Sequence, residues 1–73
     1  MAKEFEYRSY RKWELGMLYS PDLTPDAARK RLMNWIALQP ELVETLHRYG
    51  LRDSSKTFTP IQVRLIVEAL GEP

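Results

Sequence analysis

Apolar side chains recur at helical spacing in the stretch from Thr24 to Gln39. Residues three, four or seven positions apart in a helix lie on the same face. The inward face predicted by this rule contains Ala28, Leu32, Trp35, Ile36 and Gln39, and the outward face contains Lys30, Arg31 and Asn34. Arg29 falls at the margin between the two faces. The pattern predicts a helix with one face in the core and a polar face directed outward.

Prolines and capping residues divide the rest of the chain into helical segments. Thr24 followed by Pro25 is a typical helix start, and Pro40 begins another helix directly afterwards. Ser9 is the expected N-cap of an earlier helix. The chain is therefore predicted to form four helices, near residues 10–19, 25–38, 40–49 and 60–70.

The last predicted helix has the clearest local signal in the chain. Thr59 and Gln62 match a capping box, in which each side chain accepts a hydrogen bond from the other residue's backbone amide. At the end of the third helix, Gly50 is expected to form a left-handed C-cap with an apolar contact from Leu51. The polar run that precedes Phe58, RDSSKT, predicts either a plain loop or a very short hairpin between the last two helices.

These elements predict an all-α fold, a compact four-helix single domain of residues 1–73 in which residues 1–8 form an extended N-terminal arm. The expected centre of the core contains Trp35, Leu32, Leu46 and Ile66. Two further side chains are assigned to buried faces, Leu18 in the first helix and Tyr49 in the third. Gly16 weakens the first helix, which indicates a close crossing with another helix.

Two of the predicted helices carry a second apolar stripe. In the first helix this stripe is Tyr10, Trp13 and Met17, and in the last it is Ile61 and Leu65. A chain of this length buries only about 60% of the surface that its unfolded form exposes, so few apolar side chains can be left on the surface. Either the N-terminal arm covers the first stripe, or that stripe is an exposed surface that binds a partner. The Ile61 and Leu65 stripe either packs between other helices or contacts a second copy of the chain or another protein.

Composition excludes several classes of protein. Because the chain has no cysteine, neither disulfides nor thiolate metal sites can stabilise it. Its N-terminus lacks the apolar run of a secretory signal, and no stretch approaches a membrane span, which favours a cytoplasmic protein. Eleven basic and ten acidic residues give a net charge of +1, so nucleic-acid binding would require local clustering of cations.

The sequence contains no constellation that indicates catalysis. His47 is the only histidine and has no acidic cluster at metal-ligand spacing. Ser54 and Ser55 have no predicted base beside them, and the glycines are isolated rather than grouped around a phosphate. We therefore expect a non-enzymatic protein with no metal, no cofactor and no small-molecule substrate.

The outward face of the helix that begins at Pro25 is the remaining candidate for function. Lys30, Arg31 and Asn34 suit a helix in the major groove of DNA, where asparagine pairs with adenine and arginine with guanine. Arg52 and Lys56, in the loop before the last helix, are expected to assist by contacting phosphates. The alternative is a solvated basic face on an ordinary structural helix. The other function class that the sequence allows is a protein-interaction module or homodimer that uses the two apolar stripes.

Part of the chain resembles helix-turn-helix domains of the merR and excisionase type. The likeness rests first on Glu14, Leu15, Gly16 and Tyr19, followed by a turn and by Leu32 and Trp35. It continues with Gly50, Leu51 and Arg52, then Phe58 through Val63 and Ile66, which resemble the wing and the helix that follows it. Gly16 replaces the usual alanine, the turn is longer, and a third helix from Pro40 is interposed before the wing. The resemblance implies a helix-turn-helix-like arrangement.

A second likeness covers nearly the whole chain. It rests on Glu14-Leu15, Tyr19, Pro21, Ala28, Leu32, Trp35-Ile36, Leu42, Leu46, Gly50, Phe58-Thr59-Pro60, Gln62-Val63, Ile66 and Leu70-Gly71-Glu72-Pro73. In these residues the chain resembles a family of short uncharacterised proteins of gut Bacteroides-type bacteria, a domain of unknown function. The resemblance implies a compact helical domain that stands alone, and it implies no activity or site.

Overall fold

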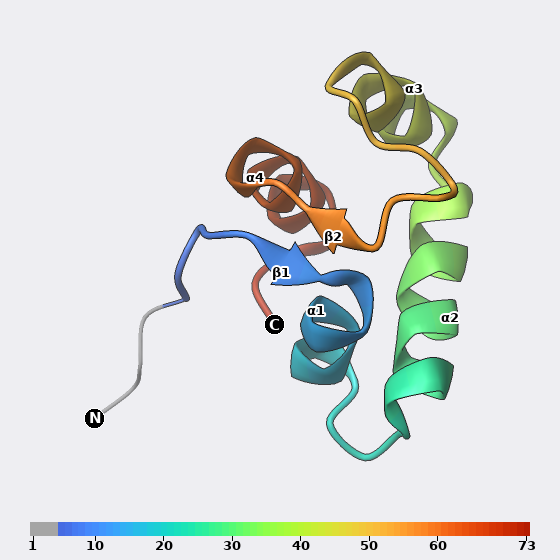
Figure 1. Ribbon diagram of the computed structural model, residues 1–73, viewed down its shortest axis with the longest axis vertical. Helices are drawn as coiled ribbons and strands as arrows, with labels where there is room; N and C mark the ends of the chain where they lie inside the picture. Colours follow the sequence, from blue (N-terminus) through green and yellow to red (C-terminus); the bar gives the residue numbers. More distant parts are fainter. Residues whose placement is uncertain (1–4) are drawn as a thin grey trace.

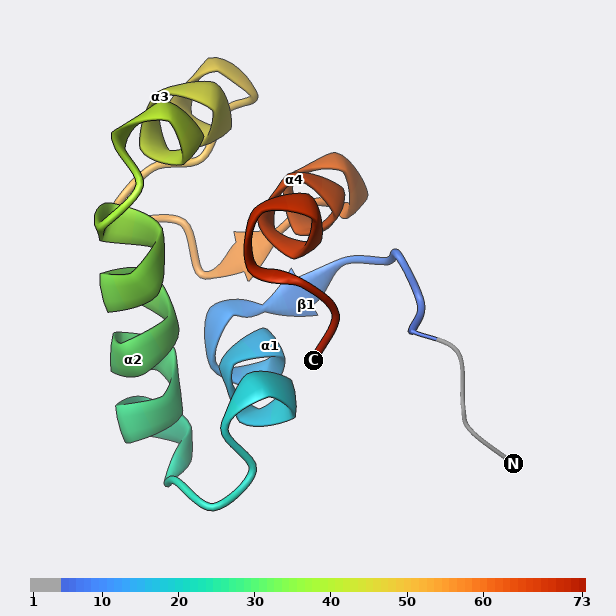
Figure 2. The ribbon, with the colours of Figure 1, turned by 180° about the vertical axis from the view of Figure 1, so that it is seen from behind.

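The computed structural model describes residues 5–73 of the chain. Its elements follow in the order β1 (Tyr10–Arg11), α1 (Lys12–Tyr19), α2 (Pro25–Ala37), α3 (Pro40–Arg48), β2 (Thr57–Phe58) and α4 (Pro60–Leu70). The two short strands lie between α1 and α4, and α2 stands along one side of the molecule (Figures 1 and 2). The fold is therefore mostly helical, with a small sheet at its centre.

The closest packing in the fold joins α1 to α2. Gly16 is buried where α1 crosses α2, and a Cβ atom added to it would lie 2.7 Å from the carbonyl oxygen of Ala28. The close crossing predicted from Gly16 is confirmed. At the start of α2, the side chain of Thr24 accepts a hydrogen bond from the amide of Ala27, as the sequence predicts.

The strands are where the structure departs most from the sequence prediction. β1 pairs with β2 in an antiparallel register that places Tyr10 opposite Phe58 and Arg11 opposite Thr57. Of the two alternatives predicted for the segment before the last helix, the hairpin is wrong, because the partner of β2 comes from before α1. Pairing satisfies the backbone groups beside two buried aromatic side chains, and α1 consequently begins at Lys12 rather than near Tyr10. The predicted Ser9 cap is wrong as well.

The ends of α3 and α4 follow local sequence signals. Gly50 has a φ of 93°, its amide donates to the carbonyl of His47, and the amide of Leu51 donates to that of Leu46. These are the two bonds of a Schellman cap, and Leu51 is buried as expected. The capping box of α4 is also confirmed, since Thr59 and Gln62 exchange both hydrogen bonds.

One apolar core joins all the elements. Its buried members are Tyr10, Leu15, Leu32, Ile36, Leu42, Leu46, Leu51, Phe58, Val63, Ile66 and Val67. The predicted central positions of Leu32, Leu46 and Ile66 are confirmed. Trp35 is half-buried at the edge of this core, where its ring meets that of Tyr19 edge to face, with 6.2 Å between the ring centroids.

Two side chains assigned to buried faces are exposed. Leu18 is exposed because the buried side of α1 is centred on Lys12, Leu15 and Gly16, and Leu18 lies more than a quarter of a turn away. Tyr49 is exposed because it follows the last helical residue of α3, where the chain already turns into the C-cap. Helical spacing therefore identified the faces but not their edges.

The described part of the N-terminal arm lies against β1. The ring of Phe5 stacks on that of Tyr10, and the Tyr10 hydroxyl donates to the carbonyl of Glu6. The arm therefore covers Tyr10, one member of the predicted second stripe, and leaves Trp13 exposed. Residues 1–4 of the predicted arm lie outside the described residues.

Candidate nucleic-acid interface

The outward face of α2 begins with a small ionic cluster. The carboxylate of Asp26 lies 2.8 Å from a guanidinium nitrogen of Arg29 and 3.1 Å from the ammonium of Lys30. Hydrogen bonds from Arg29 and then from Lys30 lower the pKa of Asp26. Both cations are therefore partly neutralised by one acidic side chain on their own helix.

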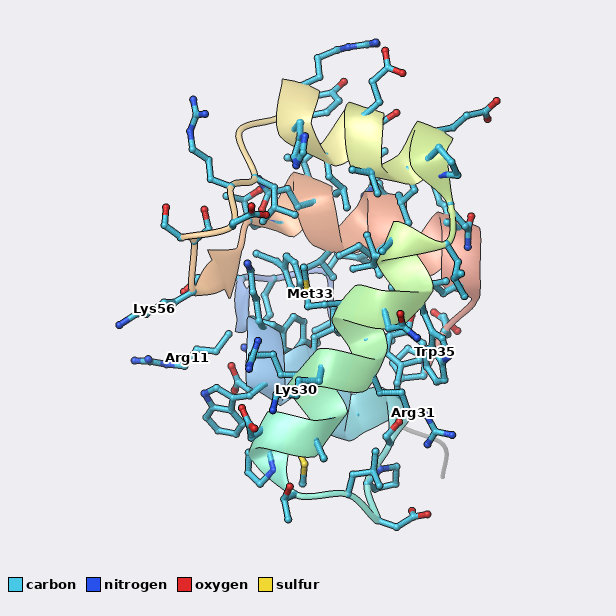
Figure 3. All side chains as sticks on the ribbon, turned by 90° about the vertical axis from the view of Figure 1, so that its right-hand side faces the viewer. Arg11, Lys30, Arg31, Met33, Trp35 and Lys56 are labelled. Carbon is cyan, nitrogen blue, oxygen red and sulfur yellow. The ribbon has the colours of Figure 1, made fainter. Side chains whose placement is uncertain are left out.

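Arg31 and Asn34 are the other two predicted contact residues of α2. Arg31 extends to the side of α2 opposite to Arg11 and Lys56 (Figure 3). Its guanidinium carbon lies 5.3 Å from the centroid of the Trp35 ring, a distance typical of a cation–π contact. Asn34 is exposed on the same helix. The structure thus distributes the predicted face over both flanks of α2.

The two predicted loop cations also separate. Lys56 is held beside β1, because its carbonyl accepts a hydrogen bond of 2.9 Å from the amide of Lys12. Its side chain lies on the same side of the molecule as that of Arg11 (Figure 3). Arg52 instead borders a hollow between α2 and α3. Lys30 shares Asp26 with Arg29, and Lys56 lines a cleft together with Arg11, Lys12 and Arg29.

A basic cleft lies between α2, the start of α1 and the loop before β2. It has a volume of about 480 Å³. Its lining residues are Arg11, Lys12, Trp13, Arg29, Asp53, Ser54, Ser55 and Lys56. Sequence reasoning selected only Lys56 among them as a DNA contact; it assigned Trp13 to an apolar stripe and gave Arg11 and Lys12 no role. The signal that was available is the unbroken run Arg11-Lys12-Trp13, two cations followed by an exposed aromatic residue.

Lys12 is unusual for a lysine because only 6% of its surface is exposed. Its ammonium donates a hydrogen bond of 3.3 Å to the carbonyl oxygen of Arg52. Burial lowers the pKa of Lys12, nearby Asp53 acts in the opposite direction, and Arg29 adds to the lowering. A negatively charged ligand in the cleft would stabilise this ammonium.

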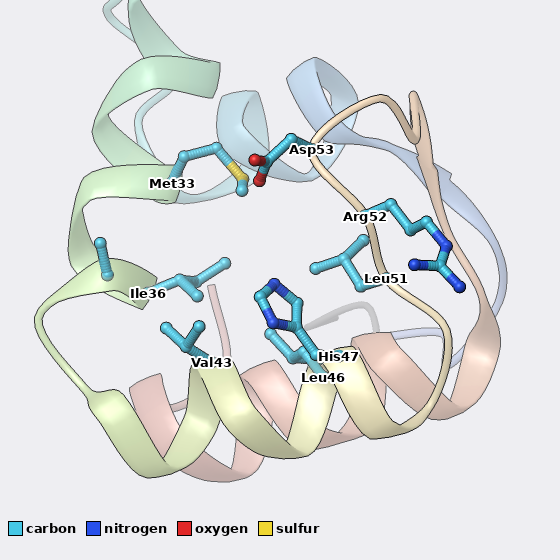
Figure 4. A pocket seen from close by; sticks show the side chains of 9 residues that line it. Met33, Ile36, Val43, Leu46, His47, Leu51, Arg52 and Asp53 are labelled. Carbon is cyan, nitrogen blue, oxygen red and sulfur yellow. The ribbon is translucent and has the colours of Figure 1, made fainter.

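A second, smaller hollow lies between α2, α3 and the same loop. Its volume is about 160 Å³, and its lining is mainly apolar, with His47, Arg52 and Asp53 around the side chains of Met33 and Leu51 (Figure 4). Ligand pockets usually have volumes of about 300–1,000 Å³, so this hollow is too small for most ligands. Among residues 5–73, no three His, Cys, Asp or Glu side chains form a group that could hold a metal ion.

The apolar stripes proposed as contact surfaces differ in exposure. Tyr10 is buried and Met17 is half-buried, so Trp13 alone remains open in the first stripe. In the second stripe Ile61 is 43% exposed and Leu65 is half-buried. Self-association through Ile61 and Leu65 stays a prediction.

The fold and the cleft together define a small, mostly helical domain whose cations gather beside one helix. The chain belongs to the family described as Domain of unknown function (DUF4248), which matches residues 6–73. The predicted membership of an uncharacterised family is confirmed, whereas the bacterial group stays a prediction. No curated protein and no solved structure matches the chain. Within the part of the chain that the structure describes, no helix is both long and apolar enough to cross a membrane.

Proposed function

We propose that this domain is a non-enzymatic cytoplasmic module that binds duplex DNA through the outer face of α2. Lys30, Arg31 and Asn34 face the major groove, and Arg52 and Lys56 contact the phosphate backbone. The observation that carries the proposal is the gathering of cations beside α2 from three separate segments: Arg11 from β1, Arg29 and Lys30 from α2, and Lys56 from the loop. In a chain with a net charge of only +1, such clustering creates a local positive field.

The arrangement around α2 also supports the proposal. A strand leads into the α1–α2 pair and another leads into α4, which is compatible with the expected resemblance to merR-type helix-turn-helix domains. Asn34 and Arg31 have the side chains that pair with adenine and guanine, respectively. Because α3 is interposed before β2, the register of α2 in the groove is left to experiment.

Fluorescence anisotropy with a random duplex at several salt concentrations tests the proposal. Replacing Lys30 and Arg31 together by alanine should weaken binding about tenfold or more at low salt and make the logarithmic salt dependence shallower by about two. The matched control removes two exposed cations from α3 and α4, Arg48→Ala with Arg64→Ala, and should change affinity much less. Salt-independent binding, or equal losses in the two double variants, would refute the proposal.

A further inference from the structure

The basic cleft contains more than cations. Its lining residues also include Trp13, Ser54 and Ser55 beside the cations Arg11 and Lys56. A volume of about 480 Å³ lies within the range typical of ligand pockets, about 300–1,000 Å³. We infer that this cleft binds one nucleoside phosphate unit, with the phosphate among the cations and the planar base against Trp13.

The buried lysine is the first reason to place an anion there. Lys12 is almost fully enclosed, yet the one hydrogen bond that its ammonium donates within residues 5–73 is long, at 3.3 Å to a neutral carbonyl. An ammonium has three donors, and burying it without a charged partner is unfavourable. A phosphate has the charge and the acceptor oxygens to satisfy it, and Arg11 and Arg29 line the same space for charge-assisted bonds.

The exposed indole is the second reason. Trp13 keeps 43% of its surface exposed and lines the cleft together with its cations. Stacking on an aromatic side chain stabilises a bound base and tolerates any base, because each base has a planar face. Hydroxyls such as those of Ser54 and Ser55 can bond the base edge or the sugar.

Asp53 is the acidic residue in the cleft lining. Figure 4 shows its carboxylate directed toward Met33, and Met33 lines the neighbouring small hollow. Asp26 pairs with Arg29, whereas Arg11, Lys12 and Lys56 form no ion pair within residues 5–73 and remain available to an anion. An acidic peptide would pair with those cations but would give Trp13 no planar partner, so the presence of the indole favours a nucleotide.

The inferred ligand has two sources, a free nucleotide or an unpaired nucleotide at the end of a DNA strand. Both present the same phosphate and base. The cleft shares Lys56 with the proposed DNA-binding face, but its remaining residues are separate from Lys30, Arg31 and Asn34. Arg11, Arg29 and Lys56 also belong to the group of cations that supports the proposed function, so Trp13, which only nucleotide binding in the cleft requires, separates the two.

Calorimetry on the unmodified chain with adenosine 5′-monophosphate tests the inference without any substitution. A parallel fluorescence titration uses Trp35→Phe, which leaves Trp13 as the only tryptophan. We expect saturable binding with quenching of Trp13. Arg11→Ala should weaken it about tenfold through the lost phosphate bonds, and Arg48→Ala on α3 should leave it unchanged.

The comparison ligands decide the chemistry and the source. Inorganic phosphate or adenosine alone should bind much more weakly than the nucleotide. Phosphate contacts only the cations of the cleft, and adenosine contacts Trp13 but not the cations. The affinity for adenosine 5′-monophosphate is then compared with that for a single-stranded oligonucleotide carrying a 5′-phosphate. The tighter ligand identifies the source, a free nucleotide or the end of a DNA strand, and either result supports the inference. No binding, equal binding of inorganic phosphate, or equal binding of a hexaglutamate peptide would overturn it. Trp13→Ala should abolish nucleotide binding and preserve duplex binding, which separates this inference from the proposed function.

Discussion

Gly16 and Ala28 meet where the two helices that carry the candidate interface cross. A Cβ atom on Gly16 would lie 2.7 Å from the Ala28 carbonyl oxygen and 2.8 Å from its carbonyl carbon. Both atoms belong to the backbone of α2, so no rotation of a side chain can relieve the overlap. The crossing therefore positions α2, and with it Arg29 and Lys30, relative to the start of α1.

We predict that Gly16→Ala destabilises the domain. Overpacking lowers the free energy of unfolding by about 1–3 kcal/mol, and the higher helix propensity of alanine offsets about 1 kcal/mol of this loss. The midpoint of thermal unfolding, followed by circular dichroism, should fall by about 5–10 °C. Adding Ala28→Gly should not restore stability, because the clash is with the backbone rather than with the Ala28 side chain. A variant as stable as the parent would show that the two helices can separate at no cost.

Tyr19 gives the fold a predicted response to alkaline pH. Its hydroxyl donates to the carbonyl of Gly71, and burial, together with the charges of Tyr7 and Glu72, raises the pKa of Tyr19 to about 12. Since an unfolded tyrosine ionises near pH 10, the folded state keeps this proton longer. The resulting stabilisation is complete below about pH 10 and is lost as the pH rises toward 12.

Tyr19→Phe removes both the hydrogen bond and the titration. Absorbance at 295 nm should show that the variant lacks the tyrosine that ionises at the highest pH. Its denaturant-unfolding free energy should be lower than that of the parent at pH 8, by about 1 kcal/mol for the hydrogen bond. The difference should narrow between pH 10 and 12. A constant difference over that interval would contradict the assigned pKa.

The features that the sequence predicts well are those decided by neighbouring residues. Thr59 and Gln62 are three positions apart and bond each other. The cap of α3 is equally local, because the amides of Gly50 and Leu51 donate to carbonyls only three and five residues earlier. The pairing of Tyr10 with Phe58 joins segments 48 residues apart, and no local pattern specifies it. The predicted helix start near Tyr10 and the predicted hairpin failed for this same reason.

In the candidate interface too, the sequence predicts the features set within one helix and not those that depend on distant segments. Helical spacing placed Lys30 on the outside of α2, and its exposure is confirmed. The cleft was not predicted, because it requires the strand pairing that carries Arg11 and Trp13 alongside the loop of Lys56. Lys12 was the least predictable residue, since a lysine is rarely buried and its enclosure depends on the backbone of Arg52.

Ile61 and Leu65 lead to a prediction about self-association. A stable interface buries about 800 Å² on each partner, and these two side chains cannot supply that area. Sedimentation velocity should therefore show a monomer at micromolar concentration and a dimer only at far higher concentration. Ile61→Glu should abolish this weak dimer. Leu38→Glu, which places the same charge at an exposed apolar residue outside α4, should not. A dimer already formed at micromolar concentration, or one unaffected by Ile61→Glu, would contradict the prediction.

Asp26 leads to a prediction that links the ionic cluster to DNA binding. Its carboxylate bonds both Arg29 and Lys30, so it partly neutralises two of the cations whose clustering supports the proposed function. Asp26→Asn keeps the shape of the side chain and removes its charge. We expect duplex binding to tighten several-fold at low salt and the logarithmic salt dependence to steepen by about one, in anisotropy measurements. Glu44→Gln is the matched control, because it frees Arg48 from a comparable helical ion pair of 3.3 Å on α3 and changes the net charge equally. Equal tightening by both variants would assign the effect to net charge alone and would exclude Asp26 as a regulator of the α2 face.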